Sequence, residues 1–116
     1  MIKKIQIVAP ASSVEEIVEY EKLKVSEIYL GFLDSNKEGW SAINKRADTS
    51  ANFNNIEDLK VVRTLFSGKI SFTLNAPFFD KSQLDDLKTQ IIQTKDFVDN
   101  YIVADISIIS LIKELA

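Results

Sequence analysis

The sequence contains no cysteine and no histidine among its 116 residues. Without cysteine the chain can form no disulfide, no thiolate metal site and no cysteine nucleophile. Without histidine it lacks the usual general base near neutral pH and the commonest metal ligand in proteins. A Ser–His or Cys–His pair for nucleophilic catalysis is therefore excluded within this chain.

Glycine and proline are also scarce, with three and two residues. The glycines do not occur at the spacing of a phosphate-binding or dinucleotide-binding loop. No apolar run approaches the roughly 20 residues that a membrane helix needs, and the first residues alternate too strictly for a signal peptide. The net charge of −3 argues against nucleic-acid binding through bulk positive charge. We therefore expect a cytoplasmic protein.

What is present is typical of a packed globular chain. Hydrophobic residues make up 46% of the sequence and charged residues 27%. The length suits one domain, and no linker-like tract divides the chain. We expect residues 1–116 to form a single domain of repeated βα units.

Four short strands are expected, each followed by a segment whose apolar residues recur at helical spacing. The strands are expected to begin near residues 4, 27, 69 and 101, and the first to end at Pro10. Ser13 and Glu16 have the spacing of a capping box and predict a helix that ends near Lys24. Strands that alternate with one-sided helices predict an α/β fold with a parallel four-stranded sheet and right-handed crossovers.

The later helices have less definite starts. Asn55 is a plausible N-cap for the second helix, and Gly68 is expected to adopt a left-handed backbone conformation after it. Asp80 or Ser82 is expected to cap the third helix. Residues 32–54 form a connection that is unusually long for such a fold, and connections of this length are usually functional or mobile.

Five segments, in this order, carry a family resemblance. They are Ala9-Pro10-Ala11, Glu27–Gly31, Ala51-Asn52-Phe53, Ser71–Asn75 and Ile102–Asp105. Together they resemble the N-terminal part of the collagenase-like peptidase family. The sequence departs from the family pattern at Ser12 and Lys24, where relatives often have glycine.

The resemblance implies half of a TIM-type (β/α) barrel. Members of the family are described as peptidases, and several are implicated in oxygen-independent hydroxylation of RNA bases or quinone precursors with an iron–sulfur cluster. The cysteines of that cluster lie beyond the matched region, and this chain has none. No cofactor is therefore expected in this chain.

Functional groups in β/α barrels project from the carboxyl ends of the strands. The residues at these ends are Pro10, Gly31, Asn75 and Asp105. Asp105 could act as a general acid or base, a metal ligand or a substrate anchor, or it could simply cap the next helix. Asn75 could present its amide to a substrate or hydrogen-bond its own turn. These two residues are our catalytic candidates.

The binding candidates are Pro10, Gly31, Arg46 and Asn52. The resemblance implies that a basic residue and an Asn-Phe pair in the long connection contribute to the pocket, which points to Arg46 and Asn52. The alternative for these two is a solvated charge and an ordinary loop turn.

Half of a barrel leaves a structural problem. We expect the uncovered face of the sheet to be apolar and both edge strands to be open. Two copies could complete a barrel, another chain could supply the missing half, or the strands could form a flat layer with helices on both faces. The leading functional hypothesis is a half-barrel of the resembled family that contributes part of a pocket for a peptide or modified base. The alternatives are a non-catalytic assembly module and a small doubly wound effector-binding domain.

Overall fold

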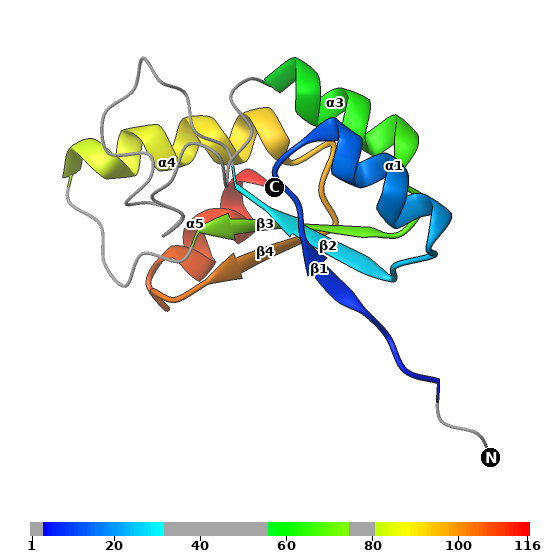
Figure 1. The fold of residues 1–116 in the computed structure, drawn as a ribbon. Coiled ribbons are helices and arrows are strands. Elements are labelled where there is room, and N and C mark those ends of the chain that lie inside the picture. The colour runs from blue at the N-terminus through cyan, green and yellow to red at the C-terminus, as the bar shows by residue number, and fades with distance from the viewer. Residues whose placement is uncertain (1–3, 32–55, 75–80) are drawn as a thin grey trace.

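The computed structural model describes residues 4–31, 56–74 and 81–116 (Figure 1). The elements are β1 (Val8–Pro10), α1 (Val14–Lys22), β2 (Glu27–Leu30), α3 (Ile56–Leu65), β3 (Lys69–Leu74), α4 (Lys81–Thr94), β4 (Asn100–Val103) and α5 (Ile108–Leu115). The predicted alternation of strands and helices is confirmed over these residues. The expected N-caps Asn55 and Asp80 lie outside the described residues, and Ser82 lies inside α4.

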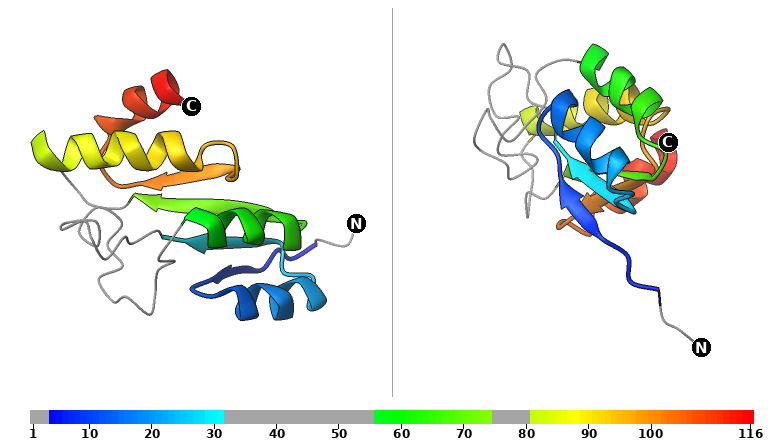
Figure 2. Two further views of the ribbon diagram at one scale, coloured as in Figure 1. Left: turned by 90° about the horizontal axis from the view of Figure 1, so that it is seen from above. Right: turned by 45° about the vertical axis from the view of Figure 1, so that its right-hand side comes forward.

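The four strands form one sheet in the order β1-β2-β3-β4, and every neighbouring pair is parallel. The α/β class and the parallel sheet are therefore confirmed. The views in Figure 2 show α1, α3 and α4 over one face of the sheet, with α5 beside α4 next to β4. In the described part of the chain, the helices do not cover both faces, as a flat doubly wound layer would require.

The first strand is shorter than predicted, because it begins at Val8 rather than near residue 4. The carbonyl of Ile7 still accepts from the backbone N–H groups of Ser26 and Glu27, at 3.0 and 3.2 Å. β2 begins at Glu27, so residues 4–6 have no strand beside them in the described part of the chain. They continue past the sheet as an exposed arm (Figure 1).

The helix-covered face of the sheet is apolar throughout. The strand register places on it Ala9, Ile28, Leu30, Ile70, Phe72, Leu74, Tyr101 and Val103. Most of them are fully buried against the helices in a single core cluster. Burial of such side chains contributes about 1.5–3 kcal/mol each, and this face therefore supplies most of the stability of the fold.

The other face is not apolar as expected. The alternate register positions place Glu27, Lys69, Ser71, Thr73 and Asn100 there, beside Val8, Pro10, Tyr29 and Ile102. The expectation treated the strands as apolar on both faces. Successive residues of a strand point to opposite faces, and many of the residues between the buried ones are polar. In β3, serine and threonine alternate with the apolar residues, and the middle of this face is therefore polar. We call it the uncovered face because no described helix lies over it, although Ser71 and Thr73 themselves are buried, with exposed fractions of 1% and 2%.

The start of α1 has the predicted cap with one difference. The Ser13 hydroxyl accepts from the Glu16 N–H at 3.2 Å, as a capping box requires. The Glu16 carboxylate reaches one residue further back than predicted and accepts from the Ser12 N–H at 3.0 Å. Two N–H groups at this helix end are thus satisfied by side chains.

The end of α1 places a lysine where glycine is favoured. Lys24 has a φ of 58°, in the left-handed region. The Val25 N–H donates to the Tyr20 carbonyl and the Lys24 N–H to the Glu21 carbonyl, at 3.1 and 3.2 Å. This is the Schellman arrangement, in which glycine is usual at the left-handed position. Lys24 therefore carries local backbone strain.

Gly68 has a different role from the one predicted. It does not adopt a left-handed conformation, and its glycine is required by close packing instead. A Cβ atom at this position would lie 2.5 Å from the Ser26 carbonyl oxygen and 2.7 Å from the Phe66 ring. The turn between α3 and β3 therefore approaches the start of β2 too closely for a side chain.

Candidate functional site

The parallel sheet brings the carboxyl ends of its strands to one edge of the molecule. Three candidates lie at this edge: Pro10 ends β1, Gly31 follows β2, and Asp105 follows β4. The candidates Arg46, Asn52 and Asn75 lie outside the described residues.

The Asp105 carboxylate is engaged by its own turn. Its Oδ1 accepts from the Ser107 backbone N–H at 2.9 Å and from the Ser107 hydroxyl at 2.7 Å. These hydrogen bonds hold the pKa of Asp105 below its usual value. The contact is a local turn in which an aspartate side chain accepts from the residue two positions later, and the N-cap residue of α5 is Ser107 rather than Asp105.

Pro10 takes part in a small polar cluster with α1. The Tyr20 hydroxyl donates to the Pro10 carbonyl at 2.7 Å and lies 3.4 Å from the Glu16 carboxylate. Burial and the adjacent carboxylate raise the pKa of Tyr20. Burial also acts to raise the pKa of Glu16, but the hydrogen bonds from Ser12, Tyr20 and Ser13 together outweigh it, and that pKa is lowered. The cluster fixes α1 against the end of β1.

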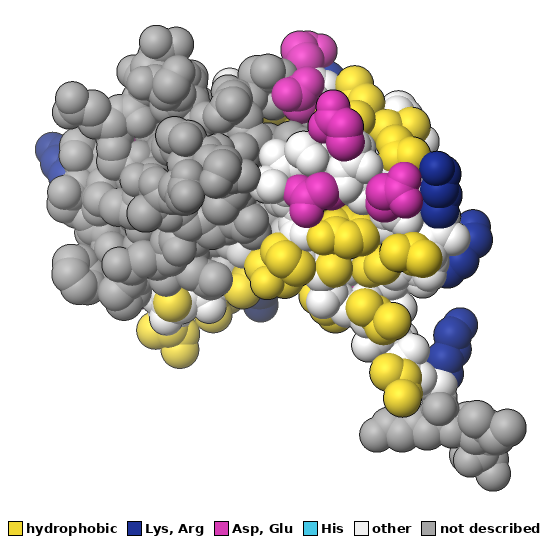
Figure 3. All heavy atoms as spheres, viewed as in Figure 1, with side chains coloured by type: hydrophobic (Ala, Val, Ile, Leu, Met, Phe, Trp, Pro, Cys, Tyr) yellow, Lys and Arg dark blue, Asp and Glu magenta, His cyan; other side chains and the backbone are white. Residues whose placement is uncertain are grey.

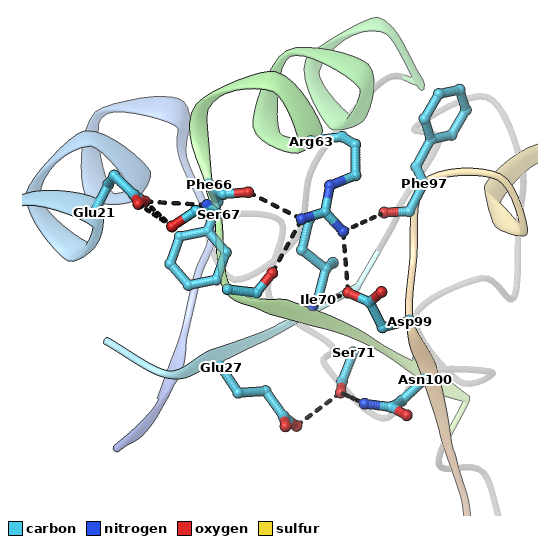
Figure 4. Close-up of polar contacts among 11 residues, drawn as sticks. Glu21, Glu27, Arg63, Phe66, Ser67, Ile70, Ser71, Phe97, Asp99 and Asn100 are labelled. Atoms are coloured by element: carbon cyan, nitrogen blue, oxygen red, sulfur yellow. Dashed lines mark hydrogen bonds and ion pairs between the residues drawn. The ribbon is translucent and has the colours of Figure 1, made fainter. Parts of the chain in front are cut away.

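A polar row crosses three strands on the uncovered face (Figure 4). The Ser71 hydroxyl donates to Glu27 Oε2 at 2.8 Å, and the Asn100 amide donates to the Ser71 hydroxyl at 3.2 Å. The row lies toward the amino ends of the strands, away from the edge where β/α barrels place their chemistry. It contains no base that could activate the serine near neutral pH other than the carboxylate of Glu27.

Arg63 joins three segments at the amino ends of the strands (Figure 4). Its guanidinium donates to the carbonyls of Phe66 and Gly68 at 2.9 and 3.0 Å, and to the Phe97 carbonyl at 3.4 Å. It also forms an ion pair with Asp99 at 3.0 Å. The planar fork of arginine suits this set of acceptors, whereas a lysine ammonium would not span it.

Asp99 continues this contact into the sheet. Its Oδ2 accepts from the Ile70 backbone N–H at 2.9 Å as well as from Arg63. Partial burial acts to raise the pKa of Asp99, but the Ile70 N–H and the Arg63 guanidinium outweigh it, and the pKa is lowered. Open α/β sheets bind their ligands at the carboxyl ends of the strands, and this contact lies at the amino ends, so we interpret the Arg63–Asp99 contact as structural.

Two shallow grooves lie on the described surface. The β4–α5 groove has a volume of about 280 Å³ and is lined by Asp99, Asn100, Tyr101, Val103, Ile109, Ile112 and Lys113. A second groove of about 340 Å³ lies between α1 and α3 and is lined by Val18, Glu21, Lys22, Lys24 and Leu65. Neither is at the edge that carries Pro10, Gly31 and Asp105.

Among the described residues, no group of three acidic, histidine or cysteine side chains is placed to bind a metal ion. The same part of the chain contains no helix long and apolar enough to cross a membrane. Neither a protein-family model, nor a curated protein, nor a solved structure matches this chain. Its function must therefore be argued from its own residues.

Sequence reasoning missed the two polar networks. Glu27 and Ser71 lie on the same face of adjacent strands, and Asn100 joins them from the next strand. The strict alternation of polar residues in 69–73 is the signal that could have placed them there. No comparable signal marks Arg63, because its acceptors are mostly backbone carbonyls at separate turns.

Proposed function

We propose that this chain is a half-barrel assembly unit, which completes its sheet by pairing through the free edge of β4. The observation that carries the proposal is the open parallel sheet itself. Its strands follow one another in sequence order, its described helices cover one face, and β1 and β4 are both edge strands. Four further strands of the same kind would close it into a barrel.

The free edge of β4 is defined by its backbone. The Asp99 N–H donates to the Ile70 carbonyl at 2.7 Å and therefore points toward β3. Backbone groups of alternate residues point to opposite sides of a parallel strand. The N–H groups of Asn100 and Ile102 thus point away from β3, where a further strand would bond to them. An edge of this kind is a template for pairing with another chain.

The family resemblance adds a substrate to this proposal. In a completed barrel the carboxyl edge would form a pocket for a peptide or a modified base. Asp105 and Asn75 would be its catalytic candidates, and Pro10, Gly31, Arg46 and Asn52 would bind substrate. The second candidate function is a non-catalytic assembly module. The engagement of Asp105 by Ser107 favours that second function.

The proposal is tested by blocking the β4 edge without disturbing the β3 ladder. Proline at position 102 removes an N–H group that points outward and keeps the inward ones. We expect the wild-type protein to self-associate in light scattering and sedimentation. Ile102→Pro should be monomeric with an unchanged circular dichroism spectrum, and Ile102→Thr should behave as wild type. A folded wild-type protein that stays monomeric at all accessible concentrations would refute the proposal.

A further inference from the structure

We infer that the strand that joins the β4 edge is the amino-terminal arm of a second copy of this chain. The arm is defined here as residues 4–7, which precede β1. It would lie parallel to β4 and insert Ile5 and Ile7 into the β4–α5 groove. The inference rests on the proposed function, because it names the partner for the edge described there.

The arm is exposed and apolar on one side. The exposed fractions of Ile5 and Ile7 are 81% and 57%. Figure 1 shows the arm projecting beyond the sheet, and Figure 3 shows hydrophobic side chains that continue from it onto the body of the molecule. Large apolar side chains that a projecting segment presents on one side are typical of an interaction surface.

The alternation of the strand directs the isoleucines toward the groove. Ala9 pairs with Ile28 and lies on the helix-covered face. Ile7 and Ile5 are two and four residues earlier, so an extended arm directs them to that same face. A shift of one residue would direct Lys4 and Gln6 there instead.

The β4–α5 groove lies on the matching side of β4. Tyr101 and Val103 pair with Phe72 and Leu74, which places them on the helix-covered face. Ile109 and Ile112 line the groove from α5. A parallel strand added outside β4 would therefore place its inward isoleucines between these four apolar side chains.

The parallel direction continues the existing sheet. Every neighbouring pair among β1, β2, β3 and β4 is parallel, and a parallel arm joined to β4 would extend the same order. Asp99, which lines the groove at the amino end of β4, keeps its contacts with Arg63 and the Ile70 N–H in this arrangement.

The size of the interface favours a dimer with two arm–groove contacts over an assembly held by one such contact. Stable interfaces bury about 1,200–2,000 Å² in total, and one short strand edge with a shallow groove is small against that. If each copy donates its arm and accepts its partner's, the contact occurs twice. A reciprocal exchange of this kind has two-fold symmetry and therefore ends the assembly at two copies.

The absence of cysteine makes this arrangement testable by disulfide cross-linking. The single variants Ile5→Cys and Ile109→Cys are mixed and oxidised, and a cross-linked dimer that contains one of each is expected. Leu23→Cys replaces Ile5→Cys in the control, because Leu23 is 72% exposed but lies at the end of α1. The control mixture should yield only the background of random collision.

A second measurement compares the dissociation constants of self-association for the wild type and two variants. Ile5→Asp places an unpaired carboxylate in the apolar groove and should weaken self-association by about two orders of magnitude or more. Leu23→Asp should leave it unchanged. If Ile102→Pro abolishes association while Ile5→Asp and the cross-linking mixture have no effect, the arm is not the partner but the proposed function stands. A monomeric wild-type protein overturns both.

Discussion

Replacing Gln90 with methionine should stabilise the fold. Gln90 lies on α4, its side chain is fully buried, and neither its Nε2 nor its Oε1 has a hydrogen-bond partner. Buried side-chain amides are nearly always paired, because desolvation is otherwise uncompensated. Methionine has a similar length and shape but presents no group that needs a partner.

The size of the effect follows from the two orphaned atoms. Leaving a buried polar group unsatisfied costs about 1–3 kcal/mol. Some of the gain is lost if neighbouring side chains must adjust to the thioether, which typically costs under about 1.5 kcal/mol. We therefore expect Gln90→Met to raise the free energy of unfolding by about 2 kcal/mol. At this chain length that corresponds to an increase in Tm of about 8 °C.

The assay is urea and thermal unfolding of the wild type and two variants on the same helix. Gln93→Met is the matched control, because Gln93 is exposed and the same substitution there removes no buried amide. We expect the control to change stability by less than about 0.5 kcal/mol. A Gln90→Met variant that is no more stable than the wild type would refute the reasoning. It would mean that the amide has a partner in solution, of which a buried water is the simplest.

Three further predictions concern the turns and the amino-end contact. Lys24→Gly should raise the free energy of unfolding by about 1 kcal/mol, because glycine removes the strain of the left-handed conformation; a lower urea midpoint would contradict this. Gly68→Ala should lower it by about 1–3 kcal/mol, since the new Cβ would collide with the Ser26 carbonyl; equal unfolding midpoints for the two proteins would show that the turn can open. In the folded protein the pKa of Asp99 lies below the usual value for aspartate, so its contribution to the free energy of unfolding is present above that usual value and is lost as pH falls through the folded pKa. Urea unfolding from neutral to acid pH should therefore show that Asp99→Asn is less stable at neutral pH, and that its difference from wild type shrinks at acid pH.

The sequence was informative where a local pattern decides the structure. The alternation of strands and helices is set by the period of apolar residues, and this prediction is confirmed in the described part. The cap at Ser13 is likewise a local matter, because the partner N–H is three residues away. Predictions of this kind need no knowledge of what lies across the fold.

The wrong predictions concern features that depend on a segment far away in the sequence. Gly68 was interpreted from its place after a helix, but its glycine is required by the Ser26 carbonyl in another turn. The first strand was predicted too early because its apolar alternation continues beyond the point where β2 begins. The role of Asp105 stays a prediction, although its carboxylate lies within hydrogen-bonding distance of Ser107.

Because the uncovered face is polar at its centre, the surfaces that would bind a partner are the edges of the sheet rather than this face. An apolar face would bind any apolar surface, and association would then be strong but unspecific. Here Ser71 and Thr73 occupy the centre of that face, and Glu27 and Asn100 are hydrogen-bonded across it. Among the described residues, what lacks a partner strand is the outer edge of β1 and of β4, and the apolar arm projects beside β1. Backbone pairing requires a strand of defined direction and register, so an assembly built on these edges selects its partner by geometry rather than by hydrophobicity alone.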